Sequence, residues 1–254
     1  MTFLPTRPAR RALGRSVASG LFLALGSAAC LASLAATSQV AAARSFTVCI
    51  DPGHPSETSD GAADNGLSEN KLNWQVGLRL RQKLLARSIG VVMTKARENQ
   101  NVTNRRRAEI ANAAHADVLI RLHCDDGGGR GFGWYYPDRS GRKYGVSGPP
   151  REVQAASREA ATLINSAMIP MLRGSLASNP VRTDAATFVG GGQGGVLTGS
   201  IFARVPTALI EMCFINKRSD ARFIASSAGQ DKMASALSVG IEHYLRNRRL
   251  WPAR

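Results

Sequence analysis

The sequence predicts an α/β fold: a single domain with a mainly parallel, twisted sheet and helices on both of its faces. Short apolar runs alternate along the chain with longer segments in which apolar residues recur every three or four positions. This alternation is typical of strands joined by helices, the arrangement that builds parallel sheets. Hydrophobic residues make up 44% of the chain, enough for a sizeable core. Residues 44–254 contain no internal repeat and no abrupt change in composition, so we expect one domain there.

Three strands and two helices are predicted in the first half of this domain. The strands are the apolar runs at residues 46–51, 89–95 and 117–124. Residues 69–87 are predicted to form a helix, because their apolar residues recur every four positions and basic residues lie off that stripe. Residues 104–116 form the second predicted helix, with Asn104 as its expected N-cap. A helix therefore follows each of the first two strands.

The second half adds two strands, two helices and a long polar segment. The strands are the runs at residues 132–137 and 207–214, and the helices span residues 151–172 and 229–249. Residues 174–200 are rich in Gly, Ser and Thr, so they are predicted to form a long Gly-rich loop. Long loops in compact domains are often functional, and two interpretations stay open: a plain surface loop, or a mobile segment over a cleft.

The first 43 residues have the three parts of an export signal. Residues 1–16 contain four arginines and no acidic residue, residues 17–36 are apolar and small, and Ala41 and Ala43 form an A-x-A cleavage pattern. We therefore expect export to the periplasm or cell envelope, with no membrane span in the mature form. A retained anchor is the alternative, because the apolar stretch is long enough to span a bilayer. The export route and lipid attachment at Cys30 stay open.

Cysteine usage argues against a disulfide framework and against a thiolate metal site. Without the export signal three cysteines remain, Cys49, Cys124 and Cys213, and an odd number cannot all pair within one chain. Each lies in an apolar run, so we expect at least one of them to be a buried free thiol, and one bridge between two of them stays open. No C-x-x-C pair is present, so zinc bound by thiolates is not expected.

Four residues that can bind a metal or transfer protons lie near the ends of predicted elements. They are His54 after the first strand, Glu69 at the start of the first helix, and His123 and Glu211 near the ends of two other strands. Because the carboxyl ends of parallel strands share one edge of a sheet, we expect these side chains to meet there. Two imidazoles and one carboxylate are typical ligands of catalytic Zn²⁺, and a second carboxylate can serve as the general base.

Each of these residues also has an ordinary structural interpretation. A single histidine after a strand is often solvated, and the helix dipole favours Glu69 in a first turn. Glu211 is harder to explain in this way, because it interrupts the apolar run "TALIEMCF" and a buried carboxylate is costly unless it is paired or functional. The coincidence of all four at one predicted edge favours a site. His115 and His243 lie within predicted helices and are expected to be structural or solvated.

Four segments, in this order, carry a family resemblance: "IDPGH", "GLSENKLN", "NRRRAEIANAAHADVLIRLHCDD" and "RVPTALIEMCFINKRSDARFI". They resemble the zinc-dependent N-acetylmuramoyl-L-alanine amidases of bacterial cell-wall remodelling, amidase type 3, over nearly all of residues 46–245. The resemblance implies that His54, Glu69 and His123 bind Zn²⁺ and that Glu211 is the catalytic acid/base. It also implies a single α/β domain with a mixed sheet flanked by helices.

The function implied by this resemblance is hydrolysis of the amide between N-acetylmuramic acid and the L-alanine of the peptidoglycan stem peptide. The formal charge of +15, and of +11 without the first 43 residues, points to an anionic partner. Nucleic acid is not expected, because the basic residues are spread along several helices without interleaved aromatics. Two other functions stay open: a non-catalytic wall-binding protein of the same fold, and a zinc peptidase acting on the stem peptide. Participation of an activator protein is also open.

Two parts of the sequence depart from the family's usual pattern. Pro55-Ser56 replaces the Gly-Gly pair that usually follows the first histidine, and a proline removes a backbone donor there. The context "RLHCDD" replaces the usual Ser-Ile before the second histidine and the usual Ala-Asn after it. Arg121 is predicted to lie on the same side of its strand as His123. Its charge is therefore expected to pair with an acid or to contact substrate.

Overall fold

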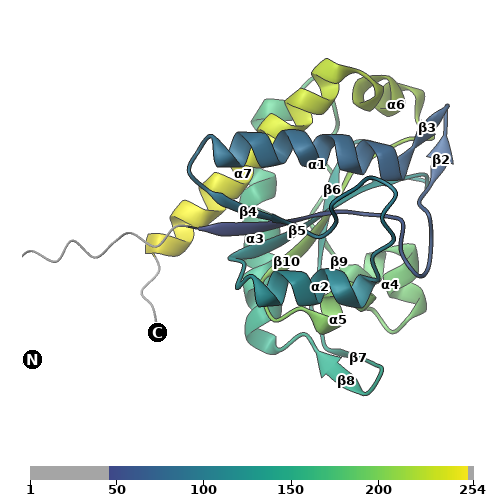
Figure 1. The fold of residues 1–254 in the computed structure, drawn as a ribbon. Helices are drawn as coiled ribbons and strands as arrows, with labels where there is room; N and C mark the ends of the chain where they lie inside the picture. The colour runs from purple at the N-terminus through teal and green to yellow at the C-terminus, as the bar shows by residue number, and fades with distance from the viewer. Residues whose placement is uncertain (1–45, 251–254) are drawn as a thin grey trace, which may run out of the picture. The chain divides into compact units, whose positions relative to one another are not determined.

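A six-stranded sheet forms the centre of the computed structural model, which describes residues 46–250 (Figure 1). Its strands, in spatial order, are β4 (Gly90–Met93), β1 (Thr47–Pro52), β5 (Val118–Asp125), β10 (Thr207–Phe214), β6 (Gly133–Tyr136) and β9 (Arg182–Thr183). The first four are parallel, whereas β6 is antiparallel to β10 and parallel to β9. The sheet is therefore mixed. The export signal predicted for residues 1–43 lies outside the described residues.

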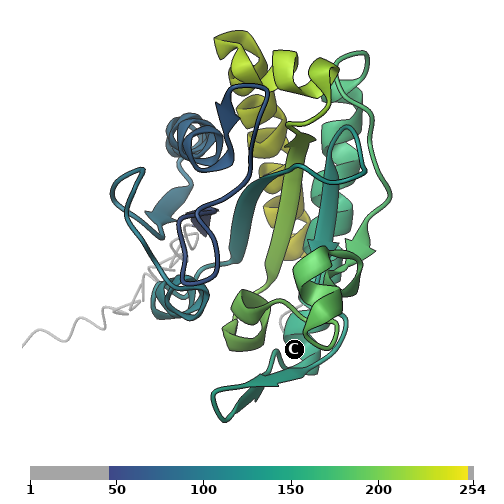
Figure 2. The same cartoon turned by 90° about the vertical axis from the view of Figure 1, so that its right-hand side faces the viewer.

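Helices cover both faces of this sheet (Figures 1 and 2). One face packs against α1 (Glu69–Leu85), α3 (Arg151–Leu172) and α7 (Ser227–Leu250). The other face is covered by α2 (Asn104–Ala113), against which α5 (Thr198–Phe202) packs. The predicted fold class is therefore confirmed. Within residues 46–250, none of the helices combines the length and the apolar character that crossing a bilayer requires.

The alternation of side chains along the central strands decides what each face carries. Ile50, Ile120 and Ile210 point into the large core beneath α1, α3 and α7. Cys49 and Leu119 point the other way, into a smaller cluster under α2. By the same alternation, the odd-numbered residues toward the carboxyl ends of β1, β5 and β10 also face the α2 side, as far as the register shift that follows Glu211 in β10. Polar residues at those positions therefore share one surface.

The predicted loop at residues 174–200 is only partly loop. It contains β9, a 3₁₀ turn at Asp184–Ala186, the short helix α4 (Phe188–Gly192) and α5. Hydrogen bonds with nearby side chains stabilise these turns, although the segment is rich in glycine. The Thr187 hydroxyl accepts the Gly190 N–H at 2.9 Å and caps α4. The Asp184 carboxylate accepts the Leu197 N–H at 3.1 Å before α5 begins.

Several short elements were not predicted. These are α6 (Arg218–Ala225) and two small hairpins, β2 (Ala63–Asp64) with β3 (Leu67–Ser68), and β7 (Gly141–Lys143) with β8 (Val146–Gly148). The expected N-cap of α2 was wrong by one residue. The Thr103 hydroxyl, not Asn104, accepts the Arg106 N–H at 3.2 Å. Asn104 instead uses its side chain at the site described below.

The cysteines of the domain are buried free thiols. Cys49, Cys124 and Cys213 are all buried and none is in a disulfide. Burial raises the pKa of the Cys49 and Cys124 thiols above the ordinary value, so both stay protonated at neutral pH. They fill core positions on β1 and β5 and are poor nucleophiles or metal ligands.

Candidate metal centre and active site

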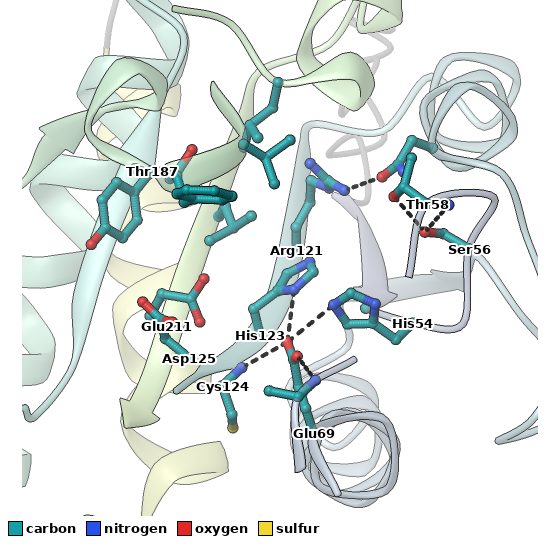
Figure 3. Close-up of a pocket in the computed structure, with 18 of the residues that line it drawn as sticks. His54, Ser56, Thr58, Glu69, Arg121, His123, Cys124, Asp125, Thr187 and Glu211 are labelled. Atoms are coloured by element: carbon teal, nitrogen blue, oxygen red, sulfur yellow. Dashed lines mark hydrogen bonds and ion pairs between the residues drawn. The ribbon is translucent and has the colours of Figure 1, made fainter. Parts of the chain in front are cut away.

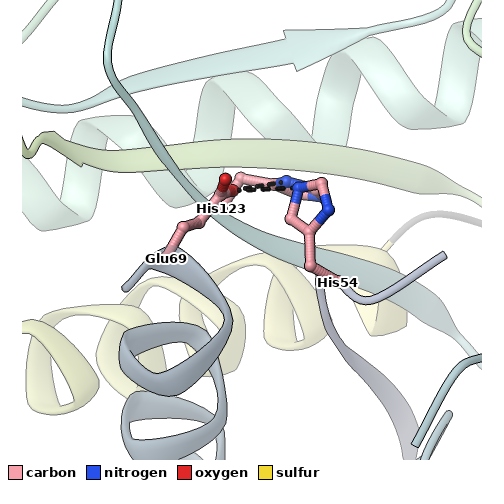
Figure 4. Close-up of side chains that lie close together, drawn as sticks. All are labelled: His54, Glu69 and His123. Atoms are coloured by element: carbon pink, nitrogen blue, oxygen red, sulfur yellow. Dashed lines mark hydrogen bonds and ion pairs between the residues drawn. The ribbon is translucent and has the colours of Figure 1, made fainter. Parts of the chain in front are cut away.

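Three residues predicted as metal ligands meet at the carboxyl edge of the sheet (Figure 4). His54 follows β1, Glu69 begins α1 and His123 lies near the end of β5. His54 Nε2 lies 3.2 Å from Glu69 Oε1, and His123 Nδ1 lies 3.0 Å from the same oxygen. One donor atom from each residue falls within 4.8 Å of the others. The chain therefore brings two imidazoles and one carboxylate to a single point.

The loop after β1 directs His54 toward Glu69. Gly53 passes so close beneath the His123 ring that any added Cβ would collide with the ring atoms. His54 itself has φ 59°, in the left-handed region that few non-glycine residues adopt. Its Nδ1 donates to the Ser59 carbonyl at 3.2 Å, which leaves Nε2 facing Glu69. A hydrogen bond from the other ring nitrogen to a carbonyl commonly orients metal-binding histidines.

Glu69 is fixed by its surroundings and stays ionised. Its Oε2 accepts the Ala62 N–H at 2.8 Å, and its Oε1 accepts the Cys124 N–H at 3.1 Å. Burial opposes ionisation, but hydrogen bonds and charge interactions with His123 and His54 hold the pKa of Glu69 well below its ordinary value. An ionised, oriented carboxylate is the form that binds a cation.

The two histidines differ in their protonation. Burial lowers the pKa of His123 to about 4, although Glu69 pulls in the opposite direction. Burial also favours the neutral ring of His54, but the hydrogen bond and charge of Glu69 outweigh it and leave the pKa of His54 raised. His123 is therefore neutral at pH 7 and ready to donate a lone pair. A protonated His54 must lose its proton before that nitrogen can bind a metal, so metal affinity is expected to rise with pH.

The donor set fits Zn²⁺. Two histidines and a carboxylate are the ligands of many catalytic zinc sites, which keep a further position open. Among the described residues, His123 Nε2 is buried and has no hydrogen-bond partner. A buried polar atom of this kind is costly unless something binds it.

Glu211 lies in the same cavity as the three residues (Figure 3). It pairs in register with His123 across β10 and β5, so both side chains face the α2 side. The cavity measures about 250 Å³. Among the described residues, Glu211 Oε2 is a buried atom without a hydrogen-bond partner. Burial, followed by the negative charges of Glu69 and Asp125, raises the pKa of Glu211 well above its ordinary value. A carboxyl with this environment in a cleft is typical of a proton-transfer group.

Arg121 pairs with an acid, which is one of the two partners, an acid or the substrate, expected for its charge. Its Nε donates to Asp51 Oδ2 at 3.1 Å, and both residues are buried. Asp51 Oδ1 also accepts from Arg107 Nη1 at 2.5 Å and from the Thr94 hydroxyl at 2.6 Å. Burial opposes the charge of Asp51, but the two arginines and Thr94 hold its pKa well below the ordinary value. The prediction that Arg121 faces the same side as His123 is confirmed, since both line the cavity.

The unusual Pro55-Ser56 pair is held by the same arginine cluster. The Pro55 carbonyl accepts from Arg107 Nη2 at 2.8 Å and from the Val102 N–H at 3.2 Å. The Ser56 N–H donates to the Ser59 carbonyl at 2.9 Å, which closes a turn beside His54. The loop therefore presents His54 without the glycines that the family usually has there.

Sequence reasoning missed two acids of this site. Asp51 ends the buried run "TVCID", and a charged residue in an apolar strand was a signal that it needs a partner. Asp125 lines the cavity beside Glu211 and follows His123 by two positions on the same face of β5. The segment at residues 174–200 also lines the cavity, through residues that include the exposed Phe188 and Val189 of α4.

Comparisons with known proteins agree with the fold and with these motifs. The family model described as N-acetylmuramoyl-L-alanine amidase matches residues 48–243. An N-acetylmuramoyl-L-alanine amidase of Mycobacterium tuberculosis is 29% identical over 199 residues, which are 74% of this chain and 73% of that relative.

Two solved structures share the fold. The Ami1 amidase of Mycobacterium smegmatis has a TM-score of 0.64 at 23% identity, covering 80% of this chain and 97% of that one. The AmiC2 amidase of Nostoc punctiforme has a TM-score of 0.62 at 21% identity, covering 79% and 97%. The family predicted from the four segments is confirmed by the family model. Because the family model spans most of the chain, the protein belongs to the N-acetylmuramoyl-L-alanine amidase family.

Proposed function

We propose that this protein is a zinc-dependent amidase that hydrolyses the bond between N-acetylmuramic acid and the L-alanine of the peptidoglycan stem peptide. The observation that carries the proposal is the convergence of His54, Glu69 and His123 beside Glu211 in one cavity. Family membership supports it, because the family's description names this activity. Identification of the ends released from purified peptidoglycan tests it, since a peptidase would cut elsewhere in the stem.

The metal ligands in this proposal are His54, Glu69 and His123. A bound Zn²⁺ supplies a Lewis acid that polarises the scissile carbonyl and lowers the pKa of water. Glu69 contributes a fixed negative charge, oriented by the Ala62 and Cys124 N–H groups. His123 contributes a neutral ring, because burial keeps its pKa near 4.

Glu211 is the general acid/base in this proposal. Its carboxylate takes a proton from the attacking water as the new C–O bond forms. It then gives that proton to the L-alanine nitrogen as the C–N bond breaks, so the products are a lactyl carboxylate and a free amine. The raised pKa of Glu211 suits this cycle, because it makes the group a stronger base than an exposed glutamate.

Replacing His123 with alanine is expected to remove bound zinc. The wild-type protein is expected to retain about one ion per chain after dialysis, as catalytic zinc sites do. Loss of one of three ligands, measured by elemental analysis, should leave the variant well below that stoichiometry. His115→Ala is the matched control, because His115 is exposed after α2 and lies outside the cavity. Unchanged zinc content in the His123 variant would remove this residue from the ligand set.

The cell envelope is the proposed location. The family's substrate lies outside the inner membrane, and the pattern of residues 1–43 is that of an export signal. The positive charge of the chain suits attraction to an anionic wall polymer. N-terminal sequencing of the protein recovered from the envelope fraction tests this location. A chain that is found only in the cytosol and keeps its intact N-terminus would contradict it.

A further inference from the structure

Arg121 lines the active-site cavity but has no part in the hydrolysis itself. It is 4% exposed and shares the cavity with His123 and Glu211. Figure 3 shows its guanidinium extending past the His123 ring, away from Glu69. A buried cation is costly unless a negative charge balances it. The guanidinium of Arg121 therefore needs a negative charge close to it.

The partners of Arg121 within the protein do not fully balance its positive charge. Asp51 is shared with Arg107, whose Nη1 lies 2.5 Å from Oδ1, so one carboxylate serves two guanidinium groups. Arg121 Nη2 donates to the neutral side chain of Asn104 at 2.8 Å. Within residues 46–250, Arg121 Nη1 takes part in no hydrogen bond or ion pair. A guanidinium has five N–H donors, so donors remain for a further acceptor.

Besides Asp51, two acids have charges that reach Arg121: Asp184 and Glu211. Neither forms an ion pair with Arg121 among the described contacts, and Asp184 Oδ2 accepts the Leu197 N–H instead. Burial raises the pKa of Asp184, which weakens it further as a counter-ion. Lys95, buried near the same cluster, adds positive charge rather than balancing it.

The guanidinium is held in place before any ligand arrives. A Cβ on Gly199 of α5 would lie 3.1 Å from Arg121 Cζ, so the guanidinium packs tightly against this glycine. Asp51 and Asn104 fix two of its nitrogens. A rigid, partly unsatisfied guanidinium is suited to binding a carboxylate with little loss of entropy.

The distance along the strand matches the stem peptide. Arg121 and His123 are two residues apart on one face of β5, which places them about 7 Å apart along the strand. An extended peptide advances by about 3.3–3.6 Å per residue, so the residue after the L-alanine reaches about this far from the scissile bond. We propose that Arg121 binds the free carboxylate of an acidic residue next to that L-alanine, and so selects stem peptides with an acid over those with an amide there. This inference rests on the proposed function.

A matched pair of substrates tests the inference. Two muramoyl peptides are compared, identical except that the residue after L-alanine carries a carboxylate in one and a carboxamide in the other. Zinc-loaded wild-type protein is expected to prefer the carboxylate by about 10- to 100-fold in kcat/KM, mainly through KM, as for a charge-assisted hydrogen bond. Arg121→Ser introduces the serine usual in the family. It should lower kcat/KM for the carboxylate substrate by that factor and change the carboxamide substrate by less than about twofold.

Arg246→Ser is the control variant, because Arg246 is exposed on α7 and pairs with Glu242 at the surface. It should leave both substrates unchanged. Equal cleavage of the two substrates by wild-type protein would overturn the inference without any variant, so the test does not depend on the folding of Arg121→Ser. An equal slowing of both substrates in that variant would assign Arg121 a structural role only. If wild-type protein cleaves neither substrate, the proposed function itself fails.

Discussion

Replacing Glu211 with glutamine is expected to lower kcat for peptidoglycan hydrolysis by at least about 10²-fold while bound zinc is retained. Glutamine has nearly the same shape but cannot accept the proton of the attacking water. Glu211 is not among the three residues whose donor atoms converge, so metal content should not change. Release of soluble muropeptides and elemental analysis on the same preparation measure both quantities.

Stability provides a second readout for this variant. The folded-state pKa of Glu211 is raised, so the wild-type protein loses stability relative to a neutral residue as pH rises above about 4.3, the unfolded value. Glu211→Gln should therefore be at least as stable as wild type at pH 7. Glu159→Gln, an exposed position on α3, serves as control and should keep full activity. Retention of most activity by Glu211→Gln would show that another group transfers the proton.

Replacing Asp51 with asparagine is expected to lower the free energy of unfolding by about 3–5 kcal/mol at neutral pH. Asp51 is fully buried and is the carboxylate that Arg107 and Arg121 share. Its removal leaves two guanidinium groups buried without a counter-charge. Arg107 also holds the Pro55 carbonyl, so the loop that presents His54 should loosen as well. Chemical denaturation followed by tryptophan fluorescence measures the change.

The pH dependence of this effect has a definite sign. Because the folded-state pKa of Asp51 is depressed, its stabilising effect is present above the unfolded pKa of about 3.9 and is lost as pH falls below it. The difference between wild type and Asp51→Asn should therefore shrink below about pH 4. Asp138→Asn is the matched control, since Asp138 pairs with an exposed arginine at the surface. A difference no larger than that of the control would mean that the buried cluster is not a net source of stability.

The layout of the fold was predictable because it depends on local pattern. The four-residue repeat that predicts α1 and the apolar runs that become β1, β5 and β10 are all visible in short windows. The segment at residues 174–200 was less predictable. Its short helices depend on hydrogen bonds from Thr187 and Asp184, which composition alone does not show. Glycine content therefore suggested a loop where the chain forms capped turns.

The convergence of His54, Glu69, His123 and Glu211 was predictable for a topological reason. β1, β5 and β10 are parallel, so His54 after β1 and His123 and Glu211 near the ends of β5 and β10 meet at one edge of the sheet. Glu69 begins the helix that follows β1, and that helix starts at the same edge. The buried cluster around Asp51 was not predictable in the same way. Its two arginines come from α2 and β5, and no spacing in the sequence reveals that one acid serves both. Arg121 was recognised as unusual, but its partner required the three-dimensional structure.

Mass spectrometry of the fragments released from purified peptidoglycan, with and without a chelator, tests the proposed reaction most directly. A zinc-dependent amidase leaves the glycan strands intact and releases stem peptides that begin with a free L-alanine amine. Release should stop when the metal is removed and resume when Zn²⁺ is added back. New ends within the stem peptide or the glycan, or full release by the metal-free protein, would contradict the proposed reaction.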